Sequence, residues 1–444
     1  MWNNDFFGGD LKGIQQKLDY LQSLGVTCLY LNPIFESHSN HRYDTADYTH
    51  IDPLLGDEAD LRSLTAAAAK RGMRVLLDGV FSHTGSDSVY FNRERRYPMD
   101  GAYNSLGSPY AGWYHFRSWP NDYGSWWGFQ TLPEVEETSP AVMEYINGPE
   151  GIVARWLRAG AAGWRLDVAD ELPDAFLDAL RTRVKATDPD AIVLGEVWED
   201  ASNKESYGHR RRYLLGKQLD SVMNYPFRDA ILGYLLGGSA ADFINKVWNV
   251  VENYPPQTLR LLMNHIGTHD TERALTLLGG EPSCGRGRSW QAQQQMTSEQ
   301  RALALRRMRL AALLQFALPG VPCIYYGDEV GLEGYKDPFN RHTYPWGGED
   351  ADLLDWYRRL GAARREAAVL AEGAFASVSA PDGVVCFARR DGEGALLCVA
   401  NAGDRAQMMH LPAEFAQGRI AVGDGALQDG WLTLPPLSGV WVVC

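Results

Sequence analysis

The chain has 444 residues, a hydrophobic content of 45% and a net charge of −14. This length predicts one large domain with a smaller second one, and the acidic balance argues against nucleic acid and anionic membranes as partners. No apolar run approaches the ~18 residues of a membrane span, and Met1-Trp2-Asn3-Asn4-Asp5 does not resemble a signal peptide. We therefore expect a cytoplasmic protein with no membrane partner.

The cysteines and aromatic residues narrow the class further. The six cysteines form no C-x-x-C pair, and Cys28 and Cys323 lie in apolar runs. This predicts buried free thiols with neither a disulfide framework nor a metal site. The chain also has 14 Trp and 21 Tyr, which suit either a carbohydrate cleft or an aromatic-rich core.

Helical and apolar segments alternate along most of the chain. Helices are expected at 11–24, 57–71, 141–157, 173–185, within 226–252 and at 299–317. Buried strands are expected at 25–33, 73–78, 163–167, 191–196, 219–224, 259–263 and 321–326. This α/β repeat predicts a parallel sheet closed into a (β/α)8 TIM barrel. About ten residues precede the first helix, so we expect the first barrel strand to be missing.

Two segments depart from the repeat. Residues 84–138 follow the strand ending at Asp78, the third of the barrel if the missing one is counted, and they lack a helical period but are rich in aromatic residues. In a barrel such a loop forms a wall of the cleft. Short alternating strands with turn signals begin near Glu372. We predict a catalytic barrel at 1–370 that includes the inserted subdomain 84–138, and an antiparallel β-sandwich at 371–444.

Polar side chains occur at the carboxyl ends of four predicted strands. Arg165 and Asp167 lie two residues apart on one strand and so point to the same face. They form either a structural ion pair or a carboxylate held ionised and aimed. The other polar strand ends are Asp78 with His83 nearby, Glu196, and His269 with Asp270. Because buried carboxylates without partners cost several kcal/mol, four such ends favour an active site.

Two kinds of chemistry use several carboxylates without a Ser or Cys nucleophile. Glycoside hydrolysis needs one ionised and one protonated carboxyl beside the bond. Arg165 is expected to lower the pKa of Asp167, which suits a nucleophile, and apolar neighbours are expected to raise that of Glu196, which suits an acid/base. Metal-assisted hydrolysis, with His83 and His269 among the ligands, is the rival. The aromatic insertion and the lack of an H-x-H pair favour the glycosidase.

At this point the sequence resembles the α-amylase family of glycoside hydrolases. The family's short regions stand as Asp78-Gly79-Val80-Phe81-Ser82-His83, Gly163-Trp164-Arg165-Leu166-Asp167, Gly195-Glu196-Val197-Trp198 and Thr268-His269-Asp270. Within this family, the sequence most resembles the branch of neopullulanases, cyclomaltodextrinases and maltogenic amylases. The segments that match this branch are Phe7-Gly8-Gly9-Asp10-Leu11, Tyr43-Asp44-Thr45-Ala46-Asp47-Tyr48, Met223-Asn224-Tyr225-Pro226-Phe227 and Asp337-Pro338-Phe339-Asn340-Arg341. Relatives carry a first barrel strand, and often an N-terminal domain, before the Phe-Gly-Gly-Asp segment; neither is expected here.

The resemblance implies a role for each matching residue. The catalytic residues would be Asp167 as nucleophile, Glu196 as acid/base and Asp270 as transition-state stabiliser. The substrate-binding residues would be Tyr43, His83, Arg165, Trp198, His269, Asp337 and Arg341, with Asp78 a structural acid beneath them. Trp198 reads equally as a sugar platform or as a core residue.

The resemblance further implies a retaining α-glucan hydrolase. It would cleave α-1,4 bonds of maltooligosaccharides, cyclodextrins or pullulan, as in starch and maltodextrin metabolism, through a covalent glycosyl-enzyme. The alternatives are an α-1,6-acting or transglycosylating member, or an inactive truncated chain that binds glucan. No cofactor is required. Calcium is an option at Gly8 and Asp10, which match half of a loop of this branch, with Asn3, Asn4 and Asp5 as a remnant of the other half. The oligomeric state is left open.

Overall fold

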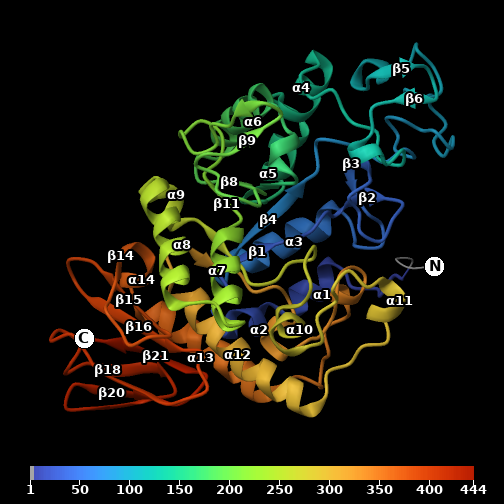
Figure 1. Cartoon of the computed structure of the whole chain (residues 1–444). Helices are drawn as coiled ribbons and strands as arrows, with labels where there is room; N and C mark the ends of the chain where they lie inside the picture. Colours follow the sequence, from blue (N-terminus) through green and yellow to red (C-terminus); the bar gives the residue numbers. More distant parts are fainter. Residues whose placement is uncertain (1–4) are drawn as a thin grey trace. The chain divides into compact units, whose positions relative to one another are not determined.

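The computed structural model describes residues 5–444, which fold as two compact units (Figure 1). The first unit extends to Val197 and includes residues 201–222, and the second comprises residues 198–200 and 223–444. The segment Trp198–Asp200 therefore belongs to the second unit, although Glu196, two residues before it, belongs to the first unit.

A five-stranded parallel sheet, in the order β1–β4–β7–β8–β11, forms the centre of the first unit. Its strands are β1 (Cys28–Tyr30), β4 (Arg74–Gly79), β7 (Gly163–Leu166), β8 (Ile192–Gly195) and β11 (Ser221–Val222). Side chains of β4, β7 and β8 are almost all buried, as expected of parallel strands covered on both faces. Because the strands are parallel, their carboxyl ends share one edge, where Asp78, Asp167 and Glu196 lie.

Helices connect these strands, as Figure 1 shows for α3, α5 and α6. They are α1 (Leu11–Gln16), α2 (Leu18–Ser23), α3 (Glu58–Ala69), α4 (Pro140–Asn147), α5 (Ile152–Arg158) and α6 (Asp174–Thr187). Two expected helices are each broken in two. The first breaks at Lys17, which has a non-helical backbone. The second breaks after α4, because Pro149 disfavours the helical conformation at Gly148, and Gly148 is extended.

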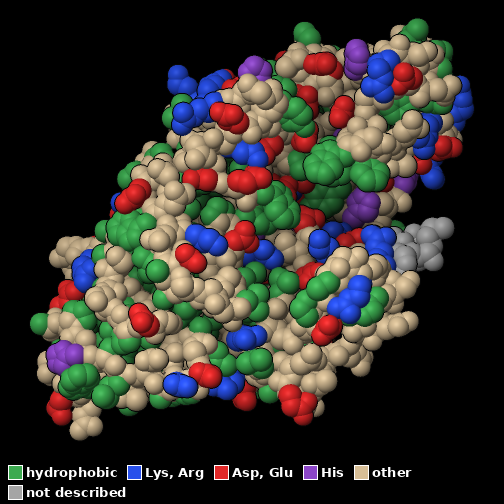
Figure 2. Space-filling view, in the orientation of Figure 1, with side chains coloured by type: hydrophobic (Ala, Val, Ile, Leu, Met, Phe, Trp, Pro, Cys, Tyr) green, Lys and Arg blue, Asp and Glu red, His purple; other side chains and the backbone are tan. Residues whose placement is uncertain are grey.

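Short hairpins and 3-10 turns fill the loops after the strands. They are β2 (Phe35–Ser37) with β3 (Thr45–Ile51), β5 (Phe116–Ser118) with β6 (Asp122–Tyr123), β9 (Glu205–Ser206) with β10 (His209–Arg210), η1 (Ala111–Trp113), η2 (Trp126–Gly128) and η3 (Ala169–Glu171). In the inserted segment, Phe91 is buried against Tyr114 and Tyr123. In contrast, Trp127 and Phe129 are 73% and 56% exposed. Hydrophobic side chains are exposed in the upper right of Figure 2, where Figure 1 draws this segment. The aromatic excess therefore serves both a core and a surface.

The second unit combines helices with one pair of parallel strands, β12 (Met263–Asn264) and β13 (Val321–Pro322). Its helices are α7 (Tyr225–Leu235), α8 (Ala240–Asn253), α9 (Pro256–Arg260), α10 (Ala274–Gly279), α11 (Arg288–Gln291), α12 (Ser298–Ala317), α13 (Ala351–Glu366) and α14 (Val369–Glu372), with 3-10 turns η4 (Asp328–Val330) and η5 (Phe339–Arg341). The prediction of a strand at 259–263 is mostly wrong, since α9 extends to Arg260 and β12 begins only at Met263. Pro256 occupies the first position of α9 and favours a helix there.

Two antiparallel sheets end the second unit. One has the order β14–β15–β16–β21–β18 and the other β17–β20–β19. Their strands are β14 (Ala374–Ser377), β15 (Val384–Arg390), β16 (Ala395–Asn401), β17 (Gln407–His410), β18 (Arg419–Gly423), β19 (Ala426–Gln428), β20 (Trp431–Leu434) and β21 (Ser438–Val443). Alternate side chains of both sheets, among them Val399, Leu432 and Val440, form one buried cluster. The expected C-terminal antiparallel sheets are therefore present.

All six cysteines are free, but only Cys386 and Cys398 are buried. The prediction of buried thiols is wrong for Cys28, Cys284 and Cys444, which are exposed, and Cys323 is only half-buried. Among the described strands, β1 pairs with β4 alone and so forms an edge of its sheet. Across residues 5–444, no helix has the length and apolar character needed to cross a membrane.

Candidate active site

Strand β7 brings Arg165 and Asp167 to the edge of the first unit's sheet. Its first residue, Gly163, has φ +148°, and a Cβ atom there would lie 2.2 Å from the carbonyl oxygen of Ile192. Only glycine fits so close to the neighbouring strand. Parallel pairing then sets Arg165 opposite Asp78 on β4 and Leu194 on β8, so carboxylates from both neighbouring strands approach its guanidinium.

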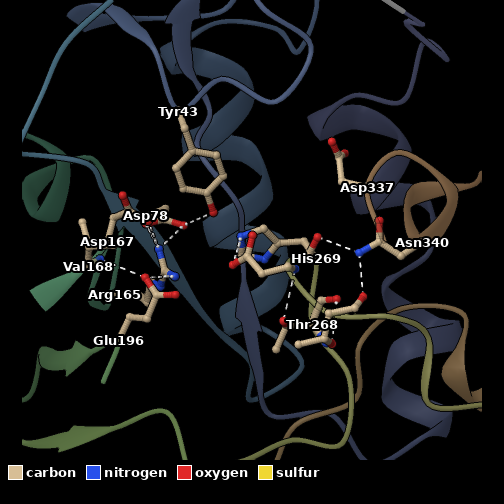
Figure 3. Close-up of polar contacts among 12 residues, drawn as sticks. Tyr43, Asp78, Arg165, Asp167, Val168, Glu196, Thr268, His269, Asp337 and Asn340 are labelled. Carbon is tan, nitrogen blue, oxygen red and sulfur yellow. Dashed lines mark hydrogen bonds and ion pairs between the residues drawn. The ribbon is translucent and has the colours of Figure 1, made fainter. Parts of the chain in front are cut away.

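The Arg165 guanidinium holds three carboxylates together (Figure 3). Its Nη1 donates to Asp78 Oδ1 and to Asp167 Oδ1, each at 2.8 Å. Its Nη2 lies 2.8 Å from Glu196 Oε2, an ion pair not aligned as a hydrogen bond. Arg165 is fully buried and the three carboxylates are nearly so. One buried cation thus faces three acids with little exposed surface, and sequence spacing correctly linked Arg165 to Asp167.

Two tyrosine hydroxyls complete the coordination of Asp78. Tyr30 donates to Asp78 Oδ2 at 2.7 Å and Tyr43 donates to the same oxygen at 3.0 Å. Tyr43 was expected to bind substrate, whereas Tyr30 was not foreseen. Tyr30 lies in β1, whose pairing with β4 sets it opposite Leu76; the only signal in the sequence was a tyrosine near the end of an apolar strand.

The backbone after Asp167 is strained. Val168 has φ 37° and ψ 62°, a left-handed conformation that costs a β-branched residue about 1–3 kcal/mol. Its N–H donates to Glu196 Oε2 at 2.8 Å. The strained turn therefore directs a main-chain donor at the second carboxylate, and such strain concentrates at functional sites.

The expected low pKa of Asp167 is wrong in this structure. Burial raises the pKa of the Asp167 carboxyl well above its usual range, the guanidinium of Arg165 opposes that rise, and the charges of Glu196 and Asp78 add to it. The sequence argument counted the neighbouring cation but not the other two acids. In the substrate-free structure, the Asp167 carboxyl therefore retains its proton to a higher pH than an exposed carboxyl would.

His83 lies beside this cluster as a buried, neutral imidazole. Its Nε2 lies 3.0 Å from the carbonyl oxygen of Tyr43, which can only accept, so Nε2 carries the proton. Its Nδ1 then accepts from the hydroxyl of Ser82 at 3.0 Å. Burial lowers the pKa of His83 to about 4. Both ring nitrogens are thus engaged, and contact with a sugar hydroxyl at Nε2 would replace the bond to Tyr43.

The second unit carries the other predicted site residues in one network. His269 Nε2 lies 3.0 Å from Asp270 Oδ2, and Arg341 contacts Asp270 Oδ1 at 3.8 Å and Asp337 Oδ1 at 3.1 Å. Asn340 was not foreseen as functional: it is fully buried, and its amide donates to the carbonyl oxygens of His269 and Thr271 (Figure 3). The motif at 337–341 was recognised in the sequence, but only the structure shows that Asn340 ties its loop to His269.

Trp198 presents an exposed ring on a rigid support. Its ring stacks on that of Tyr225 with centroids 4.1 Å apart and an interplanar angle of 15°, and Trp198 is 45% exposed. Tyr225 is buried and packs edge-on against His265. Between the two readings of Trp198, core residue and sugar platform, the exposure favours the platform.

The option of calcium at Gly8 and Asp10 finds no support in the described residues. Asp10 caps α1, and its Oδ1 accepts from the N–H of Gly13. Within residues 5–444, no group of three His, Cys, Asp or Glu ligands includes Asp10, whereas calcium takes six to eight oxygen ligands. Asn3 and Asn4 lie outside the described residues. Calcium at this loop stays a prediction.

Comparison with known proteins places these features in a family. The catalytic domain of α-amylase matches residues 2–355. The chain is 38% identical to an amylopullulanase of Thermoanaerobacter thermohydrosulfuricus over 97% of its own length and 31% of that protein, so it spans about a third of this relative. It is 34% identical to neopullulanase 2 of Thermoactinomyces vulgaris, over 99% of the chain and 71% of that protein.

A solved structure agrees with these matches. The cyclic α-maltosyl-(1→6)-maltose hydrolase of Arthrobacter globiformis, in complex with that cyclic sugar, has a TM-score of 0.84 at 28% identity, covering 100% of this chain and 91% of that one. Together with the family match, this likeness confirms the predicted fold class, a β/α barrel followed by antiparallel C-terminal sheets.

Proposed function

Since the chain belongs to the α-amylase family of glycoside hydrolases, we propose that it is a retaining α-glucan hydrolase. Its substrates are maltooligosaccharides, cyclodextrins or pullulan, cleaved at α-1,4 bonds. The observation that carries the proposal is the pair of carboxyls, Asp167 and Glu196, held at adjacent strand ends by the two terminal nitrogens of Arg165. The names of the amylopullulanase and neopullulanase relatives support the substrate class.

In the first half of the reaction, the Asp167 carboxylate attacks the anomeric carbon. The glycosidic C–O bond breaks, and Glu196 donates its proton to the leaving oxygen. Arg165 lowers the cost of ionising Asp167 and aims its Oδ1, while the Val168 N–H and the guanidinium orient Glu196. This step requires an ionised Asp167 and a protonated Glu196 in the productive complex.

In the second half, water replaces the leaving group. The Glu196 carboxylate takes a proton from water, and the resulting hydroxide attacks the anomeric carbon of the ester to Asp167. Asp167 leaves as a carboxylate, and the sugar regains the α configuration after two inversions. An acceptor hydroxyl in place of water would give transglycosylation.

The remaining roles follow from the family pattern. Asp270 stabilises the positive charge of the transition state, and His269 and Arg341 hold its carboxylate. Tyr43 and His83 bind the sugar at the point of cleavage, Asp337 and Arg341 bind the next one, and Trp198 offers a stacking platform. These assignments are part of the proposal.

The stereochemistry of the first product tests it. Proton NMR of maltotriose hydrolysis is expected to show α-anomer before mutarotation, since the retaining route inverts the anomeric carbon twice. Initial formation of β-anomer would refute the roles of Asp167 and Glu196.

Cleavage of α-1,6 bonds is the second candidate. It is favoured by the likeness to a hydrolase whose cyclic ligand contains a (1→6) bond. Panose has one α-1,4 and one α-1,6 bond, so its early products distinguish the two: maltose with glucose reports α-1,6 cleavage, and isomaltose with glucose reports α-1,4 cleavage. A cytoplasmic location likewise stays a prediction.

A further inference from the structure

A group of metal-ligating side chains lies on the hairpin of β2 and β3, separate from the carboxylates that Arg165 holds. The side chains of Glu36, Asp47 and His50 each offer one ligand atom, and these atoms all lie within 4.8 Å of one another. Glu36 and Asp47 are direct cross-strand partners and are half-buried, whereas the side chain of His50 is 68% exposed.

The charges of this group are not balanced by the protein. Like charges directly opposite each other on paired strands are destabilising, yet within residues 5–444 neither Glu36 nor Asp47 makes an ion pair with Lys or Arg. The nearest basic atom is His50 Nδ1, at 2.8 Å from Asp47 Oδ2. A bound cation would remove the repulsion that this pairing otherwise imposes on the hairpin.

Each carboxylate is also oriented through one of its two oxygens. Tyr97 donates to Glu36 Oε1 at 2.9 Å. The N–H and hydroxyl of Thr49 donate to Asp47 Oδ1 at 2.7 and 2.6 Å. Within residues 5–444, Glu36 Oε2 then has no hydrogen-bond partner, and Asp47 Oδ2 bonds to the imidazole of His50, whose Nδ1 lies 2.8 Å away. Outer donors that fix the ligating carboxylates are a regular feature of metal sites.

We propose that Glu36, Asp47 and His50 bind a divalent transition-metal ion, with Zn²⁺ the best match. An imidazole in the ligand set favours Zn²⁺ over calcium or magnesium. Zinc bonds to N and O are about 2.0–2.2 Å long, so the ligand atoms must close in, and the ion would replace the present contact between His50 Nδ1 and Asp47 Oδ2. Water completes the coordination.

The site would fasten the two strands of the hairpin. The loop between them, residues 38–44, carries Tyr43, whose hydroxyl contacts Asp78. Metal binding is therefore expected to steady this loop without entering the chemistry at Asp167. The proposal stands whether or not the chain hydrolyses glucans.

Isothermal titration of the metal-stripped chain with ZnCl₂ tests the proposal. One ion per chain is expected, with binding weakened at least about 100-fold in Glu36→Gln and in His50→Ala. Tyr97→Phe, which removes an outer donor only, is expected to weaken it about 10–100-fold. His410→Ala removes an exposed histidine of the C-terminal sandwich and is expected to leave binding unchanged.

Two results would overturn the site. One is no zinc binding by the parent chain below millimolar concentration. The other is equal binding by the parent, His50→Ala and Glu36→Gln, which would assign the ion elsewhere. Circular dichroism and turnover of maltotriose by His50→Ala, whose side chain is exposed, establish that a loss of zinc binding is not a loss of fold.

Discussion

The two acidic networks of this chain use the same residue types under opposite conditions. Around Arg165, three buried carboxylates share one guanidinium that has no exposed surface. Around Arg341, the side chains of Asp270 and Asp337 are 35% and 29% exposed and have both a histidine and an arginine beside them. The first network has one buried cation for three buried acids, so its electrostatics are strong; the second is partly exposed, so solvent screens its charges.

Removing the nucleophile is expected to have the largest effect on activity. Asp167→Asn should lower kcat on maltotriose by at least about 10⁴-fold, as knockouts of a covalent nucleophile do. The substitution also removes one of three charges that crowd Arg165, so the melting temperature should not fall. Wild-type turnover by this variant, with intact circular dichroism, would show that another group attacks the substrate.

Removing the cation should destabilise the two networks unequally. Arg165→Met leaves three buried carboxylates without a partner, and we expect a loss of about 3–5 kcal/mol in unfolding free energy. Arg341→Met is the matched control, and its partly exposed pairs predict a loss of at most about 1 kcal/mol. Urea denaturation of both variants at pH 7 measures the contrast. Equal losses would contradict the difference in burial.

Burial of His83 predicts a loss of stability in acid. Its pKa of about 4 in the folded chain lies below the ordinary 6.5, so between these values the unfolded chain binds a proton that the folded chain excludes. The unfolding free energy should therefore fall as the pH drops from 6.5 towards 4, by about 2–3 kcal/mol from this residue. His83→Gln should show a correspondingly smaller loss when urea midpoints at pH 7 and pH 4.5 are compared with those of the parent. An identical loss in both proteins would assign the acid lability to other groups.

The exposed platform at Trp198 should have the smallest effect. A stacking contact contributes about 0.5–1.5 kcal/mol, so Trp198→Ala should raise KM for maltotriose by up to about tenfold with kcat nearly unchanged. Trp431→Ala, which removes an exposed ring of the C-terminal sandwich, is the control. A KM equal to that of the parent would show that Trp198 is a packing residue and does not bind sugar.

The sequence predicted the structure best where a local pattern of residues determines the secondary structure. Apolar runs located β4, β7 and β8, and the spacing of Arg165 and Asp167 correctly placed both on one face. Proline overrode the apolar period at Pro149 and Pro256. The pKa of Asp167 could not be foreseen, because it depends on how many acids the fold brings to one cation. Tyr30 and the N–H of Val168 could not be foreseen, since each acts through a contact distant in sequence. Asn340 lies in a recognised motif, but its bonds to His269 and Thr271 are equally distant. The domain boundaries and the individual site roles stay predictions.

The central claim, that Asp167 forms the bond to sugar, has one direct test. Glu196→Gln should react with α-maltosyl fluoride, whose leaving group needs no proton, and should then lack the base that releases the sugar. Mass spectrometry of a peptide digest is expected to find a maltosyl ester on Asp167, which Asp167→Asn cannot form. An adduct on another residue, or fluoride release at the parent rate with no adduct, would contradict this account.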